Sequence, residues 1–172
     1  MEQKLTPPWM IALITSLICI VMNIVAYAMN QLTNKSLGYI QMILQFGIII
    51  WACIHYAKQK EGQVTFGNVF AHGFKVTAGI AAIISIYTFI SVKLIYPEII
   101  EMTIDAARAE MEKKGQVPAD QIDMALGFTR KFFLPFAIAG SLFGIALLGV
   151  VASLIGAGVA KKNPISPFEN AS

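Results

Sequence analysis

The chain has 172 residues, of which 56% are hydrophobic and only 13% are charged, with a formal net charge of +3. A soluble domain carries roughly 25% charged residues, so the charges present here would not cover the surface of a soluble globule. The mean hydropathy of +0.66 excludes a disordered chain, and a count of two cysteines excludes a disulfide scaffold. The composition therefore predicts an integral membrane protein, with a single membrane domain over residues 1–172.

Four apolar segments follow one another along the chain. A helix that crosses the ~30 Å hydrocarbon core of a bilayer needs about 20 apolar residues. The expected spans are 9–29, 37–57, 75–96 and 134–160. The sequence thus predicts an all-α fold, a membrane-spanning four-helix bundle.

The first and third spans each allow a second interpretation. Ala26-Tyr27-Ala28 fits a signal-peptide cleavage pattern, but the apolar part of a signal is about 7–15 residues, and this segment is longer. Before the third span, Thr65 and the phenylalanines that follow at intervals of four predict a helical lead-in along the membrane surface. The alternative is that the third span simply starts early.

The polar insert 97–131 predicts a helical hairpin outside the bilayer, between spans three and four. Pro97 suits the first turn of a helix, and Gly115 offers a left-handed stop. A second helix is expected from Pro118, running into span four with a kink at Pro135. Apolar stripes at helical spacing are formed by Ile100, Ile104, Ala107 and Met111, and by Ile122, Ala125, Leu126, Thr129 and Phe133. We expect the two stripes to pack on each other; the membrane surface and a partner protein are the alternatives.

An even number of spans places both termini on one side of the membrane. That side has six basic residues and the other has seven, so the positive-inside rule does not decide on totals. The bases on the termini side all lie close to the end of a span, which favours cytoplasmic termini. These six are Lys4, Lys58, Lys60, Lys75, Lys161 and Lys162.

Tyrosines are expected to mark the membrane surface opposite the termini. Tyrosine favours the interface because one end of its side chain is apolar and the other is polar. Tyr27, Tyr39 and Tyr96 all fall at the expected ends of spans on that side. We therefore expect all three to lie at the interface.

Several polar side chains fall at similar depths within the spans, in the half of the bundle away from the termini. An amide that faced lipid would lack hydrogen-bond partners, at a cost of several kcal/mol. We therefore expect these side chains to face inward and meet. The expected cluster is Asn23, Gln41, Gln45, Ser85, Thr88 and Ser141. We interpret the cluster as structural; a pocket for a small ligand or substrate is the alternative.

Small residues mark one face of span four. Gly140 and Gly144 form a GxxxG pair, and Gly149, Ser153 and Ala157 continue the pattern. Such residues let helices approach closely, within the bundle or between copies of a chain. Packing within the bundle is the expectation, and self-association is the alternative.

No pattern in the sequence predicts catalysis, a cofactor, a metal site or a nucleic-acid partner. The spans contain no Asp or Glu, which argues against proton-coupled transport. His55 and His72 are expected at the interface and make no zinc motif. Cys19 and Cys53 lie at different depths and do not form a redox pair.

Taken in order, these features resemble a known family. The segment from Glu61 to Phe74 before span three, Tyr96-Pro97-Glu98 at the start of the insert and the basic exit at Lys161-Lys162 resemble the domain-of-unknown-function family numbered 4199. The likeness covers nearly the whole chain. It implies a small bacterial four-span protein of the inner membrane without assigned activity, and it implies no functional residues.

We expect a non-enzymatic protein in lipid, with a structural or interaction role. The insert 97–131 is expected to dock a protein partner or a second copy, giving a homo-oligomer. One alternative is a small transporter or channel subunit that acts as an oligomer, with Asn23, Gln41 and Gln45 along its path. The least favoured is an enzyme acting on lipid headgroups, for which Glu98, Arg130 and Lys131 would have to converge.

Overall fold

The computed structural model describes residues 5–32, 34–115 and 118–163. The described residues contain no strand, and four of their helices are long and apolar enough to cross a membrane. These are α1 (Pro8–Ala28), α2 (Lys35–Gln59), α3 (Phe66–Ile90), which continues into the π-helical turn η1 (Ser91–Ile95), and α6 (Phe133–Val159). The prediction of an all-α protein with four spans is confirmed. Lys4, which entered the charge count, lies outside the described residues.

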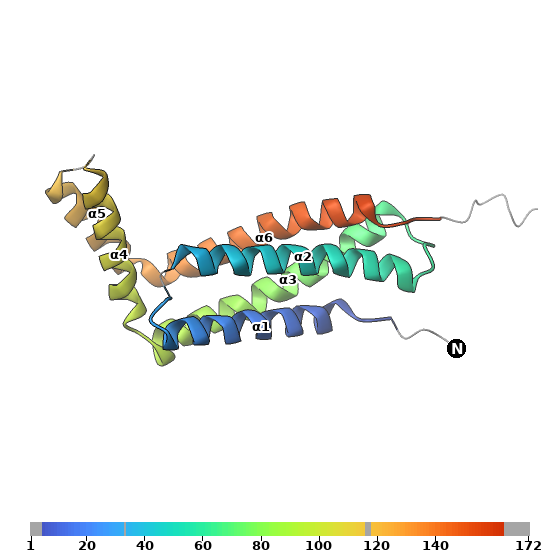
Figure 1. Cartoon of the computed structure of the whole chain (residues 1–172), viewed down its shortest axis with the longest axis horizontal. Helices are drawn as coiled ribbons and strands as arrows, with labels where there is room; N and C mark the ends of the chain where they lie inside the picture. Colours follow the sequence, from blue (N-terminus) through green and yellow to red (C-terminus); the bar gives the residue numbers. More distant parts are fainter. Residues whose placement is uncertain (1–4, 33, 116–117, 164–172) are drawn as a thin grey trace, which may run out of the picture.

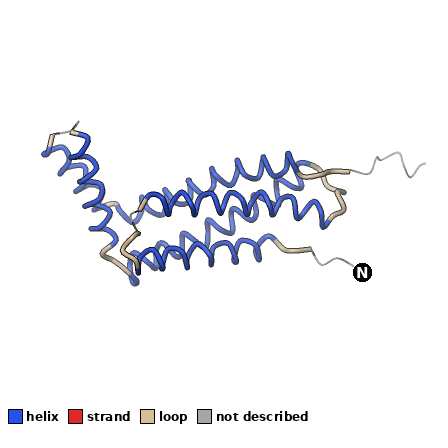
Figure 2. Tube along the Cα trace, viewed as in Figure 1, coloured by secondary structure: helices blue, strands red, loops and turns tan. Residues whose placement is uncertain are grey.

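The four long helices form a bundle with two distinct ends (Figure 1). The start of α1, the end of α6 and the loop between α2 and α3 lie at one end, which we call the termini end. At the other end, which we call the hairpin end, α4 (Ile99–Lys114) and α5 (Ala119–Lys131) project from the bundle. Figure 2 shows that the loops connecting the long helices are confined to these two ends.

Local sequence signals explain three of the helix ends. Asn34 accepts a hydrogen bond from the Ser36 amide at 2.9 Å and caps α2, and the Thr65 hydroxyl accepts from the Asn68 amide at 3.2 Å and caps α3. Gly115 ends α4 in the left-handed conformation, with φ of 60°, as its position predicted.

The third span differs from the prediction at its start. Helix α3 is continuous from Phe66, so residues 66–74 are its first turns and not a separate helix on the membrane surface. The Thr65 cap starts the helix, and no proline or unpaired backbone group interrupts it afterwards. The alternative of an early start is therefore the one observed.

The junction between hairpin and span four also lies slightly away from its predicted place. Helix α5 ends at Lys131 and α6 begins at Phe133, so the break falls at Phe132 and not at Pro135. Pro135 has no backbone N–H for the Lys131 carbonyl, and its ring crowds that same group. The proline therefore breaks the helix about one turn before Pro135, at Phe132.

Helix α3 is the centre of the bundle and packs against α1, α2 and α6, while α6 also packs against α2. The central core contains the fully buried side chains Ile49, Val76 and Ile80, with Ala12 and Ala152. Large apolar side chains point outward along all four helices, among them Leu17, Ile43, Ile86, Phe143 and Val159. An interior that includes small residues such as Ala12 and Ala152, with many large apolar side chains outside, is typical of helices packed in lipid.

The small residues of α6 divide between two environments. A Cβ on Gly149 would lie only 2.0 Å from Thr77, so α3 and α6 need a glycine there. Ser153 and Ala157 are also fully buried. Gly140 and Gly144 are different, because no described atom would lie within 4 Å of an added Cβ. The GxxxG pair therefore does not contribute to packing within the described bundle.

Candidate functional site

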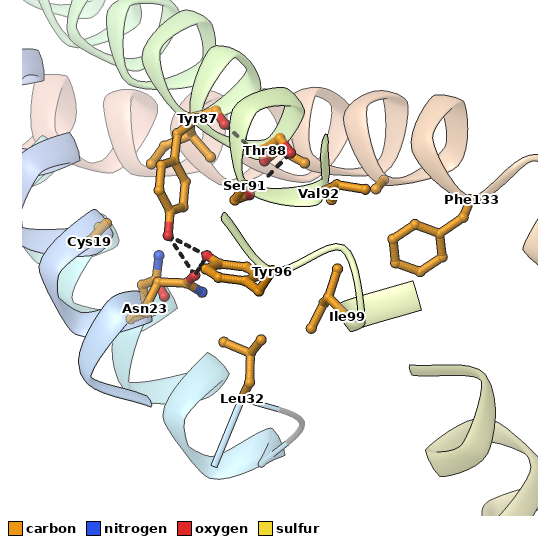
Figure 3. Close-up of a pocket in the computed structure, with 13 residues that line it drawn as sticks. Cys19, Asn23, Leu32, Tyr87, Thr88, Ser91, Val92, Tyr96, Ile99 and Phe133 are labelled. Atoms are coloured by element: carbon orange, nitrogen blue, oxygen red, sulfur yellow. Dashed lines mark hydrogen bonds between the residues drawn. The ribbon is translucent and has the colours of Figure 1, made fainter. Parts of the chain in front are cut away.

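The main polar cluster of the bundle lies at the hairpin end and joins α1, α3 and the residue after η1. The Tyr87 and Tyr96 hydroxyls each donate to the Asn23 side-chain oxygen, at 2.9 and 2.5 Å (Figure 3). The two hydroxyls also contact each other. This cluster ties the ends of α1 and α3 together through side chains.

The π-helical turn η1 explains how Tyr96 reaches the cluster. Its wider turn ends with the Tyr96 amide donating to the Ser91 carbonyl at 2.9 Å, after which the backbone leaves the helix. The chain then folds back toward α1, where the Tyr96 ring stacks on Tyr27 with centroids 4.6 Å apart. Only 2% of Tyr96 is exposed, so its side chain is enclosed by the protein at the end of the bundle.

A cavity of about 260 Å³ opens beside this cluster (Figure 3). All four long helices contribute to its wall, and the wall carries no charged side chain. Its lining residues are Cys19, Asn23, Leu32, Gln41, Ile84, Tyr87, Thr88, Ser91, Val92, Tyr96, Ile99, Phe133 and Ala137. A second cavity of about 280 Å³ shares Asn23, Leu32 and Gln41 with the first, and lies between the ends of α1 and α2. The chemistry of the first cavity suits an uncharged ligand that forms hydrogen bonds.

The first cavity does not continue through the bundle. Gln45 is 6% exposed and its amide donates to the Cys19 sulfur at 3.3 Å, about one helical turn deeper than Asn23. Beyond that pair, Ile49 and Ile80 fill the central core without exposure. The cavity is therefore blind toward the termini end in this conformation.

The six polar residues predicted to meet are only partly brought together. Asn23, Gln41 and Thr88 line one cavity, and Gln45 is buried below it. The hydroxyls of Thr88, Ser85 and Ser141 donate to carbonyls of their own helices, at 2.8, 2.7 and 2.9 Å. A hydroxyl that is satisfied within its own helix does not need a partner across the bundle, so depth alone did not predict contact.

The two donors of the cluster, Tyr87 and Tyr96, were not among the polar residues predicted to meet. Tyr87 could have been found, because its hydroxyl lies inside an otherwise apolar run and needs a partner. Tyr96 had no such signal, since its position at the end of a span is equally typical of an interfacial tyrosine.

The hairpin is tied to the bundle at two points. Lys35 at the start of α2 forms an ion pair of 2.7 Å with Glu110 of α4, and the Tyr27 hydroxyl donates to the Glu98 carboxylate. These contacts stabilise the charged carboxylates. The pKa of Glu98 is lowered by the bond from Tyr27, and the pKa of Glu110 is lowered chiefly by the bond from Lys35.

The hairpin also has a core of its own, as the sequence predicted. Ile104 of α4 packs against Ile122 and Leu126 of α5, and all three are buried. Ion pairs cross between the two helices, from Arg108 to Asp123 and from Arg130 to Glu101.

An apolar stripe remains exposed along the outside of α5 and the start of α6. Met124 is 77% exposed, Phe128 56% and Phe136 53%, with Phe132 between the two phenylalanines. The three phenylalanine rings form a cluster with centroids 4.7 to 6.2 Å apart. We call these four residues the α5 stripe; the sequence analysis did not identify them.

The three residues considered for catalysis, Glu98, Arg130 and Lys131, do not converge, because each interacts with a different side chain. Glu98 bonds to Tyr27, Arg130 to Glu101, and the Lys131 ammonium lies 5.7 Å from the centre of the Phe132 ring. At the termini end, His72 is 7% exposed and stacks on Tyr56 with centroids 4.3 Å apart, so its side chain is buried in the protein. Within the described residues, no group of three His, Cys, Asp or Glu side chains is placed to hold a metal ion.

Comparison with known proteins identifies a family. The model of the family described as "Protein of unknown function (DUF4199)" matches residues 11–162. No curated protein and no solved structure matches the chain.

Proposed function

Because the chain belongs to the DUF4199 family of unknown function, we propose a function from its own geometry: a non-catalytic protein of the inner membrane that binds another protein through its hairpin. Both termini are assigned to the cytoplasm in this proposal. The charge at the termini end supports that orientation, since five described lysines accompany a single carboxylate there. These residues are Lys58, Lys60, Lys75, Lys161 and Lys162, with Glu61.

The α5 stripe is the observation that carries the interaction role. The hairpin is already folded on its own core of Ile104, Ile122 and Leu126, so the stripe is not needed to hold α4 and α5 together. Met124 and Phe128 lie on α5, outside the candidate spans, and exposed apolar surface outside the membrane typically marks an interaction site. Phenylalanine and methionine are also among the residues enriched at protein interfaces.

A photo-crosslinking amino acid at Phe128 tests this role in the full-length protein in cells. We expect a discrete crosslinked protein at this position and none from Asp105, which is exposed on α4. A crosslink to a second copy would make the partner the chain itself. A crosslink to lipid alone from Phe128, with equal protein capture from Asp105, would contradict the proposal.

A matched variant separates binding from folding. Phe128→Ser replaces a side chain that is 56% exposed, so the variant is expected to fold with the wild-type yield in detergent. It is also expected to lose most of the protein captured by a crosslinker at Met124. Full capture by this variant would exclude the stripe as the docking surface.

Transport is the second candidate, and the cavity lined by Asn23 and Gln41 favours it. A transport path needs access from both sides, whereas a binding pocket needs access from one. Thr88→Cys in a chain without Cys19 and Cys53 tests this with a membrane-impermeant maleimide. Labelling from the hairpin end alone supports a pocket, and labelling from either end in turn supports transport.

A further inference from the structure

A second surface of the bundle has the shape and charge of a lipid site, at the end opposite the hairpin. It lies along the seam between α2 and α6. A cavity of about 390 Å³ at the termini end is lined by Ile54, Ala57, Lys58, Glu61, Gly62, Lys161 and Asn163. The proposed function does not use this surface.

The two lysines in this cavity come from different segments that are held side by side. Lys58 is in the last turn of α2, and Lys161 follows the end of α6. The Asn163 amide donates to the Gly62 carbonyl at 2.8 Å and fixes the chain after α6 against the loop after α2. Gly62 has φ of 79°, which favours glycine, and a Cβ there would lie 3.1 Å from the Asn163 nitrogen.

A neighbouring lysine is already engaged, so it does not compete for the same ligand. The Lys162 ammonium donates to the Ala157 carbonyl and, at 3.0 Å, to the Ala160 carbonyl at the end of α6. It also lies 5.8 Å from the centre of the Phe66 ring. Lys58 and Lys161 are exposed, and Glu61 is the one carboxylate in the cavity wall. The wall therefore carries a net positive charge.

A separate apolar groove lies farther along the same seam, toward the middle of the bundle. A cavity of about 530 Å³ is lined by Met42, Ile43, Phe46, Gly144, Leu147, Leu148 and Val151. Between the two cavities the helices nearly touch, since a Cβ on Gly156 would lie 3.3 Å from the Ile50 Cα. Gly144, Val151 and Gly158 recur every seventh residue, so they lie on one face of α6.

The distances fit an amphiphile of one leaflet. Ten residues separate Val151 from Lys161, which is about 15 Å at the rise of an α-helix. The hydrocarbon half of a bilayer is also about 15 Å thick. A headgroup at Lys58 and Lys161 would thus place the end of an acyl chain beside Val151.

We propose that this seam binds one anionic glycerophospholipid of the leaflet at the termini end. Lys58 and Lys161 contact the phosphate, and an acyl chain lies in the groove between α2 and α6. Basic residues near a membrane surface attract anionic lipids, and the net positive wall favours an anionic headgroup over a zwitterionic one. The exposed Gly158 lies between Lys161 and Val151 in sequence, and no described atom would contact a Cβ added there, so it leaves room for the chain.

Native mass spectrometry of the full-length protein in detergent tests the headgroup contact. The probes are phosphatidylglycerol and phosphatidylcholine of the same acyl chains. We expect the first phosphatidylglycerol to bind about tenfold more tightly than phosphatidylcholine, because two lysines contribute. The double variant Lys58→Gln and Lys161→Gln is expected to bring this ratio close to one.

Two further variants complete the test. Lys113→Gln with Lys114→Gln removes two lysines from α4 and is expected to keep the tenfold ratio. Gly158→Leu adds a side chain on the face of α6 that also carries Val151, without a clash in the bundle, and is expected to weaken phosphatidylglycerol binding about threefold by obstructing its chain. The site would be disproved by an unchanged ratio in the Lys58 and Lys161 variant, or by an equal loss in the Lys113 and Lys114 variant. Unchanged affinity in Gly158→Leu would overturn the acyl groove.

Discussion

The two ends of the bundle are built on different principles. At the termini end, small side chains let helices touch: a Cβ on Gly73 would lie 2.5 Å from the Cys53 sulfur and 2.6 Å from the Ser153 hydroxyl. At the hairpin end, Asn23, Tyr87 and Tyr96 stand between the helices, and a cavity remains beside them. Close packing leaves no space between the helices at the termini end, where the cavity lies on the outside along α2 and the segment after α6, whereas the hydrogen-bonded cluster of larger side chains at the hairpin end leaves a cavity among the four helices.

The two ends of the bundle also differ in their charged residues. The described residues at the hairpin end include seven bases and seven carboxylates, and several of them pair with one another, as Arg108 does with Asp123. The termini end is basic and has one described carboxylate, Glu61. A balanced, self-paired surface suits contact with a protein, while a basic surface suits contact with anionic lipid. The proposed protein site and the proposed lipid site follow this division.

The largest expected loss of stability comes from placing a bulky side chain in the closely packed termini end. Gly156→Leu would place side-chain atoms against Cys53 and the Ile50 Cα, so α2 and α6 must separate. We expect a destabilisation of about 3 kcal/mol, the upper range for overpacking, measured by unfolding in detergent. Gly140→Leu is the control at the hairpin end, and its free energy of unfolding should lie within about 0.5 kcal/mol of that of the wild type. Equal losses in the two variants would remove the distinction between the ends.

A smaller effect is expected from the core of the hairpin. Ile122→Ala removes a side chain that is 3% exposed between α4 and α5, at a cost of about 2 kcal/mol. Hydrogen exchange should become faster in α4 and α5 while α3 and α6 keep their protection, because the hairpin packs mainly on itself. Loss of protection throughout the bundle would show that the hairpin and the bundle unfold together.

The polar cluster should contribute less than either core. Asn23→Leu removes the acceptor for two hydroxyls, and hydrogen bonds between membrane helices average about 0.6 kcal/mol. We expect a loss of about 1 kcal/mol in detergent unfolding, with Tyr96→Phe losing about half as much. A loss near that of Gly156→Leu would mean that the hairpin end is held as tightly as the termini end.

The smallest effect is expected from removing the ion pair between α2 and the hairpin. Lys35→Gln should speed hydrogen exchange at the start of α4 only about twofold, because exposed ion pairs contribute little. The pKa of Glu110 is lowered in the folded state, so its contribution is complete above the unfolded-state pKa and is lost as pH falls through the lowered pKa. Exchange in wild type and variant should therefore converge in acid. A difference that persists below that pH would assign the effect to something other than this pair.

The sequence by itself determined the elements of this protein. Charge-free runs of about 20 residues can lie only in lipid or a large core, and Pro97, Gly115 and Pro118 delimit the hairpin, because apolar length and backbone chemistry act locally. The spans therefore agree with the helices to within one or two residues at most ends.

Tertiary structure alone decided which side chains meet. Helix rotation and crossing placed Gly149 against Thr77 and left Gly140 and Gly144 facing outward, although all three belong to one small-residue pattern. The turn η1 brought Tyr96 to Asn23, 73 residues away in sequence. Such contacts depend on the relative rotation of whole helices, which is set by the packing of many side chains together and is not contained in the spacing of any one segment.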